Sequence, residues 1–265
     1  MVSRHLKSVV LLTLVFTLFF GIYFTWNPSP VRSQEQPAAR PGPDHSGMDH
    51  SHGHMSASEP LSPDQQAKLL RDKRESEFNH HLAGLLLVLA GIFILFEPRL
   101  KRRFPLVRYA WPLCFLVAGI LLLIFSDTEL WPFGHKDWLV GVIGNLEVLQ
   151  HKAFAAILMI LGVIEFRRAR GTLEASWSAW AFPALAFAGS FLLLFHAHDA
   201  GMVGPDPMTE MHRIQMQHVS YAGVGAAIGL LKGLSDTSST ARPVFRALWP
   251  LLLIFLGILL LLYAE

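Results

Sequence analysis

Long apolar runs recur along this chain and limit what it can fold into. They cover about 8–25, 79–96, 109–126, 153–166, 179–197, 218–231 and 247–263. A helix needs about 20 mostly apolar residues to cross a hydrocarbon core of ~30 Å, and the runs are close to that length. The composition agrees, since 52% of the residues are hydrophobic and 16% are charged. We predict an all-α, polytopic membrane helix bundle with six transmembrane helices after the first run.

The chain divides into three predicted parts. Residues 1–26 are a signal peptide or an anchor helix, because a basic start precedes an apolar stretch that is long for a signal core. Residues 27–78 form an exported segment that we predict to be disordered, and 79–265 form the six-helix membrane domain. The run 153–166 is short, so we expect its helix to continue outward through Leu149 and His151.

The positions of Lys and Arg in the connections give the predicted orientation, because basic connections stay in the cytoplasm. Eleven basic residues lie in three alternate connections: Arg99, Lys101, Arg102, Arg103, Arg108, Arg167, Arg168, Arg170, Lys232, Arg242 and Arg246. The connections 127–152 and 199–217 hold only Lys136, Lys152 and Arg213. We therefore predict a bacterial inner-membrane protein in which every histidine except His5 lies toward the periplasm.

The exported segment contains a short tract rich in metal-binding side chains. Residues 44–55 hold four histidines and two methionines, namely His45, His50, His52, His54, Met48 and Met55. Imidazole and thioether groups suit copper, and a flexible tract can wrap around an ion. The alternative is a solvated linker with incidental histidines.

A second group of histidines lies at the outer ends of four apolar runs: His80, His81, His151, His196, His198 and His218. Ionisable side chains at membrane depth usually face the bundle interior, where they bind or relay something. Neighbouring residues on a helix face different ways, so His80 and His81 cannot both point inward. We choose His81, His151, His196 and His218 as metal ligands, with His198 as an alternative to His196.

Other side chains have predicted supporting roles. Met211 or His212 is expected to cap the site from the connection above it. Glu147 precedes His151 by one helical turn and is expected to orient its ring. The segment 127–132 has the character of a membrane-interface segment, and we assign no chemistry to it.

Several functions are disfavoured by what the sequence lacks. A cytochrome with a haem near each face needs a second histidine layer, and a cation channel needs polar groups along its path. The inner halves of the runs offer neither, so the site is expected to be a blind pocket that opens outward. Cys114 is alone, which disfavours a thiolate metal site. A net charge of +2 gives no reason to expect nucleic-acid binding.

Four stretches resemble the CopD/PcoD-type copper-resistance proteins of bacterial inner membranes. They are Asn79-His80-His81, Ser126 to Pro132, Gln150-His151-Lys152, and His196 to His218, within a similar region of about 79–263. The resemblance implies copper handling on the periplasmic side. The broader superfamily also resembles b-type haem bundles, which keeps an electron-transfer function open.

Our hypothesis is a membrane protein that binds copper ions at its periplasmic face and exchanges them with periplasmic copper carrier proteins. The alternative is a b-type cytochrome with a single outer haem between two of the four chosen histidines. A third hypothesis is a membrane-embedded metal-dependent oxidase or hydrolase.

Overall fold

The protein is helical throughout the part of the chain described by the computed structural model, which is 62–130, 133–196, 207–237 and 242–264. The elements are α2 (Pro63–Leu100), η1 (Pro105–Tyr109), α3 (Ala110–Phe125), α4 (Trp138–Gly144), α5 (Leu146–Arg170), α6 (Ser178–Leu194), α7 (Pro207–Thr237) and α8 (Arg242–Leu261). Within these ranges the only β-type pairing is an isolated bridge between Leu130 and Lys136. The predicted all-α class is confirmed. The first apolar run and the tract 44–55 lie outside the described residues.

The helix α2 starts well before its apolar run. Ser62 and Gln65 form a capping box, in which the Ser62 hydroxyl accepts from Gln65 N at 3.3 Å and Gln65 Oε1 accepts from Ser62 N at 2.9 Å. Residues from Pro63 onward are therefore helical, and the prediction of disorder up to residue 78 was wrong for this stretch. This helical stretch could not be predicted from the sequence, because it is rich in charged residues and its apolar residues do not recur at the spacing of a helix.

The helix α5 begins earlier than its apolar run, as predicted. Asn145 caps its start by accepting a hydrogen bond from Val148 N at 3.2 Å, and the helix ends at Gly171, whose φ is 76°. His151 therefore lies on the helix itself. The helix α6, in contrast, ends at Leu194, so His196 stands just past the helix end.

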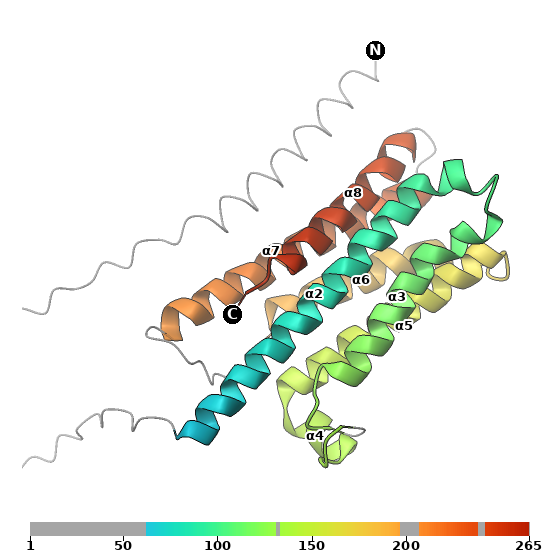
Figure 1. Ribbon diagram of the computed structural model, residues 1–265. Helices are drawn as coiled ribbons and strands as arrows, with labels where there is room; N and C mark the ends of the chain where they lie inside the picture. Colours follow the sequence, from blue (N-terminus) through green and yellow to red (C-terminus); the bar gives the residue numbers. More distant parts are fainter. Residues whose placement is uncertain (1–61, 131–132, 197–206, 238–241, 265) are drawn as a thin grey trace, which may run out of the picture.

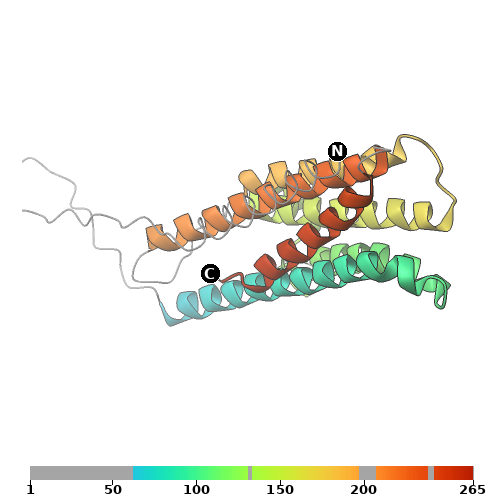
Figure 2. The same cartoon turned by 90° about the horizontal axis from the view of Figure 1, so that it is seen from above.

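The six long helices form a closed ring. The helices α2, α3, α5, α6, α7 and α8 follow one another around it, and α8 returns to pack against α2 (Figures 1 and 2). Among the described residues, each of these helix backbones comes close only to its two neighbours in the ring. Figure 2 shows α8 running obliquely between α2 and α7. The interior of the ring is lined by side chains of all six helices.

Close contact between α2 and α8 completes the ring. A Cβ atom on Gly84 would lie 2.6 Å from the Gly257 carbonyl oxygen, and one on Gly257 would lie 2.6 Å from that of Gly84. Only glycine permits this approach of two backbones, which is a common way for helices to pack in membranes. This contact fixes the rotation of α2 about its axis.

Chemically different groups occupy the two ends of the bundle. At one end, Asn79 Nδ2 on α2 donates to the Phe125 carbonyl at the end of α3 at 3.1 Å, next to His80 in the sequence. We call this the histidine end. At the other end, Arg168 contacts Asp236 at 2.9 Å, beside the connections rich in Lys and Arg. We call this the basic end.

Four helices are long and apolar enough to cross a membrane: α2, η1 with α3, α5 and α8. The helix α6 is apolar but has only 17 residues. Large apolar side chains point outward from the ring, such as Phe191 in α6, which is 61% exposed, and Phe96 in α2, which is 47% exposed. An apolar exterior of this kind suits contact with lipid.

Candidate metal centre

Four histidines from four parts of the ring form a continuous row at the histidine end. The ring centroids of His151 and His196 lie 5.2 Å apart, those of His196 and His218 lie 5.0 Å apart, and those of His218 and His80 lie 5.9 Å apart. We call His151, His196, His218 and His80 the histidine row. The predicted convergence of imidazoles from four helices on one level is present.

Two members of the row are fixed by the backbone of their own helix. Nδ1 of His80 lies 2.8 Å from the carbonyl oxygen of Ser76, and Nδ1 of His218 lies 2.8 Å from that of Ile214. A carbonyl oxygen can only accept, so Nδ1 carries the proton in both rings. The lone pair is then on Nε2, the nitrogen that a metal would bind.

The other two members are fixed by side chains of neighbouring segments. Nδ1 of His151 donates to Asp127 Oδ1 at 3.2 Å, and Nδ1 of His196 donates to Gln150 Oε1 at 2.8 Å. Gln150 also donates from Nε2 to the carbonyl of Phe195 at 2.9 Å, which fixes the orientation of its amide. In their neutral forms, all four rings thus hold their lone pair on Nε2. Partners of this kind set the tautomer of metal-binding histidines in general.

A carboxylate joins the row at one side. One ligand atom each from Glu147, His151 and His196 lies within 4.8 Å of the other two. Glu147 was predicted to orient His151, and the structure shows Asp127 bonded to Nδ1 of that ring at 3.2 Å. Small movements of three side chains would bring these atoms onto one ion.

The spacing of the rings distinguishes between two kinds of metal group. With a metal–nitrogen distance of about 2 Å, two imidazoles on one tetrahedral ion have ring centroids about 5 Å apart. Two axial ligands on opposite sides of a haem iron have centroids about 6 Å apart. The His151–His196 and His196–His218 separations of 5.2 and 5.0 Å match the first arrangement. The residues present therefore fit an ion shared by adjacent histidines.

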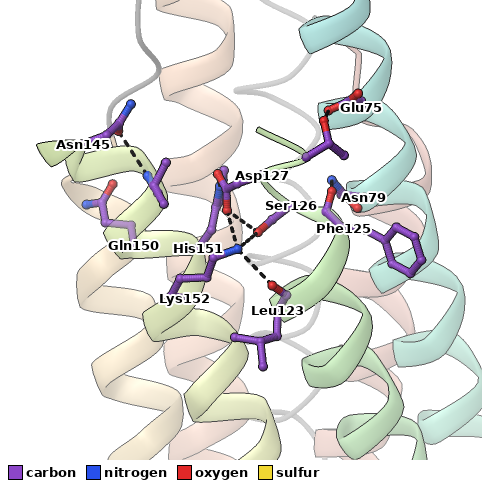
Figure 3. A network of polar contacts seen from close by, with 12 residues as sticks. Glu75, Asn79, Leu123, Phe125, Ser126, Asp127, Asn145, Gln150, His151 and Lys152 are labelled. Atoms are coloured by element: carbon purple, nitrogen blue, oxygen red, sulfur yellow. Dashed lines mark hydrogen bonds and ion pairs between the residues drawn. The ribbon is translucent and has the colours of Figure 1, made fainter. Parts of the chain in front are cut away.

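Asp127 connects the row to a buried lysine (Figure 3). Its Oδ2 atom lies 2.7 Å from Lys152 Nζ, which also donates to the Leu123 carbonyl at 2.9 Å and to Ser126 Oγ at 3.0 Å. Burial by itself raises the pKa of Asp127, but the hydrogen bond and charge of His151, together with hydrogen bonds from Lys152 and Ser126, lower it to about 2. Asp127 is thus a charged group that holds His151 in place.

Sequence reasoning missed this role of Asp127. The segment 127–132 was assigned no chemistry, and its first residue, Asp127, contacts His151 in the structure. The signal available in the sequence was an acidic side chain at the end of an apolar run, at the same expected depth as a histidine. Gln150 and Lys152 flank His151 and were missed for the same reason.

The structure places His80, rather than the predicted His81, beside the other histidines. Nε2 of His81 lies 3.0 Å from the carbonyl oxygen of Tyr263 beyond α8, whereas His80 lies beside His218 and stacks on the Tyr263 ring at 3.8 Å. Adjacent residues on a helix point about 100° apart, so the contact of α2 with α8 decides which one faces the row. Tyr263 is only 2% exposed and closes this side of the site.

The predicted capping residues do not reach the row. Met211 is 38% exposed, and His212 is exposed as well, on the outward part of α7. His198 and the tract residues His45, His50, His52, His54, Met48 and Met55 lie outside the described residues.

A cavity of about 980 Å³ passes the histidine row and continues into the ring. Its mouth is polar, with Lys68 and Glu129, while Leu158 and Leu256 are among its inner walls. We call the part beyond the histidine row the chamber. Phe115 and Phe182, with ring centroids 5.9 Å apart, form its floor. The cavity is lined by no described residue of the basic-end connections, in agreement with the expected blind pocket.

Charged groups lie behind the floor of the chamber. Lys232 is 5% exposed and places its Nζ atom 5.7 Å from the ring centroid of Phe182 and 5.4 Å from that of Trp249. It pairs with Asp236 at 2.5 Å, and Arg168 pairs with Glu165 at 2.8 Å. Arg168 on α5 also lies 2.9 Å from Asp236 on α7, and this pair ties the two helices together at the basic end.

No protein-family model, curated protein sequence or solved structure matches this chain. The resemblance to the CopD/PcoD-type proteins over 79–263 therefore remains a prediction made from local sequence.

Proposed function

We propose that the histidine row binds copper at the periplasmic face of a bacterial inner membrane, as part of copper homeostasis or resistance. One observation carries the proposal: four imidazoles from different parts of the ring stand side by side, each held with its lone pair on Nε2.

The proposal includes six membrane crossings. Four helices meet the length and composition for a span. We infer that α6 and α7 also cross, because they complete the same ring beside α5 and α8. The basic end then faces the cytoplasm under the rule for basic connections. In this orientation the mouth of the cavity opens to the periplasm, where the tract 44–55 and copper carrier proteins meet it.

The donor set supports copper over harder cations. Imidazoles with a single carboxylate suit copper or zinc, and copper(II) binds most strongly among the divalent ions of the first transition row. The methionines of the tract 44–55 add ligands that suit copper(I). We propose that the tract captures copper and that the histidine row holds it.

The haem alternative has one observation in its favour, which is the size of the apolar chamber next to the row. The ring separations near 5 Å speak against a haem between adjacent histidines. An axial pair would have to come from His80 and His218, whose centroids are 5.9 Å apart. A Soret band in the optical spectrum of the purified protein would establish this alternative.

The test uses the full chain purified without a histidine tag, with residues 44–55 deleted so that only the bundle site is measured. Copper is counted by elemental analysis, and bound copper(II) is examined by electron paramagnetic resonance. We expect about one copper with nitrogen hyperfine structure, and an affinity at least ~10-fold lower in His151→Ala and His196→Ala.

His212→Ala is the matched control, because His212 is exposed on α7 away from the row. It should leave copper binding unchanged. Equal copper content in the two row variants, with normal helicity by circular dichroism, would show that the row is not the copper site.

A further inference from the structure

The chamber is a site in its own right, because the histidines use only its rim. From His196 down to Phe182 it extends on the order of 20 Å, from a rise of ~1.5 Å per residue along α6. Its walls are almost entirely apolar: Leu122, Phe154, Ile157, Leu158, Leu193 and Leu256. Such walls offer no ligand atoms to a metal ion, whereas they can bury the apolar surface of a lipid-soluble molecule.

One polar group interrupts these walls. Ser190 on α6 lines the chamber, is 7% exposed, and has no hydrogen-bond partner for its Oγ atom within the described residues. Serine in a helix commonly bonds to its own backbone, so a buried hydroxyl without a partner requires an explanation. Gly225 on α7 makes room for it, since a Cβ there would lie 2.7 Å from Ser190 Oγ.

We propose that the chamber binds an elongated lipophilic molecule that carries an oxygen atom at the depth of Ser190. The Ser190 hydroxyl donates to that oxygen, and the apolar part of the molecule fills the space between Ser190 and the floor at Phe182. Two sources have this chemistry: a lipid-soluble quinone, through a ring carbonyl, and a bilayer lipid or fatty acid, through its acyl carbonyl. The proposal is independent of copper binding at the row.

The chain offers a well-matched pair of variants. Gly189 lines the chamber, and a Cβ atom there meets only Phe154 at 3.9 Å, so Gly189→Leu fills the chamber without a backbone clash. Gly223 on α7 is exposed, with nothing within 4 Å of a Cβ, so Gly223→Leu adds the same group outside the chamber. Ser190→Ala removes the donor, and Ser220→Ala removes a hydroxyl that bonds to the Met216 carbonyl on α7.

The experiment begins with the full chain purified in mild detergent, followed by solvent extraction and mass spectrometry. We expect about one lipophilic molecule per chain in the parent protein and in Gly223→Leu, and its loss in Gly189→Leu. A quinone in the extract identifies the first source, and a fatty acid or phospholipid identifies the second.

Binding is then measured with added short-chain ubiquinone and, separately, with palmitate. The molecule that binds should do so about fivefold more weakly in Ser190→Ala, the loss of one hydrogen bond, and equally well in Ser220→Ala. The helicity of Gly189→Leu by circular dichroism and its elution as a single species in detergent report on whether the variant is folded. The proposal is overturned if the parent protein yields and binds neither compound, if Gly189→Leu retains the molecule, or if the extract contains haem.

Discussion

The side-chain oxygen of Gln150 lies 2.8 Å from Nδ1 of His196, and it is the contact that ties the segment after α6 to α5. His196 stands past the end of its helix, which is Leu194. Gln150 holds both the ring and, through the Phe195 carbonyl, the backbone beside it.

Replacing Gln150 should therefore weaken metal binding without touching a ligand. In Gln150→Ala we expect a copper affinity about 10-fold to 100-fold lower, since His196 loses the partner that orients it. Competition with a chelator of known affinity measures this. Gln215→Ala is the control, because Gln215 is exposed on α7. An equal loss of copper affinity in both variants would show that Gln150 does not act by orienting His196.

Because of Asp127, we expect the free energy of unfolding of the bundle to depend on pH in the acidic range. Its pKa falls from 3.8 to about 2 in the folded protein, so its stabilising effect is complete above pH ~4 and is lost as the pH drops toward ~2. The effect is on the order of 2 kcal/mol. Cys114 is the only cysteine and is buried, so its reaction with a thiol dye on heating reports unfolding.

The Asp127→Asn variant checks the assignment. It should unfold at a lower temperature at neutral pH, because Lys152 is left buried without its charged partner. It should also lose most of the acid dependence between pH ~4 and ~2. An unchanged acid profile would show that another carboxylate is responsible.

The orientation can be tested with single cysteines in a Cys114→Ser background. His135→Cys and Glu174→Cys place exposed thiols at the histidine end and the basic end, respectively. An impermeant reagent added to whole spheroplasts should label the first and leave the second unlabelled until the membrane is broken. The reverse pattern would place the histidine row in the cytoplasm.

The ion pairs behind the chamber floor should be important for stability. Glu165 is 3% exposed and lies 2.8 Å from Arg168 and 3.9 Å from Lys232. Glu165→Gln leaves buried positive charge in excess, so we expect a loss of about 3–5 kcal/mol in unfolding free energy. The same thiol-dye measurement applies. Glu174→Gln, at an exposed position, should have no effect.

The sequence was sufficient to predict the apolar parts of the long helices and the clustering of histidines at one end, but not the first part of α2 or the short helix α4. Runs such as 109–126 and 247–263 are too apolar and too long for another structure, and α3 and α8 fall within a few residues of them. Alternating helix directions then bring His80, His151, His196 and His218 to the same end. The helices and the end at which the histidines lie both follow from the order of apolar and polar residues, which can be read directly from the sequence.

The details of the site depend on contacts between helices, which sequence does not display. Whether His80 or His81 faces the row follows from the close approach of Gly84 and Gly257. The partners of His151 and His196 lie 24 and 46 residues away in the chain. Contacts between residues so far apart in the sequence can be identified only when the packing of the helices is known.

The closure of the ring by α8 also has a consequence for biosynthesis. A chain is made from its N-terminus, so α2 to α7 are in place before α8 is. Until α8 arrives between α2 and α7, the side of the chamber lined by Leu253, Leu256 and Leu260 has no wall. The lipophilic molecule proposed for the chamber can enter from the bilayer during that interval, besides entering the finished bundle through the mouth of the cavity.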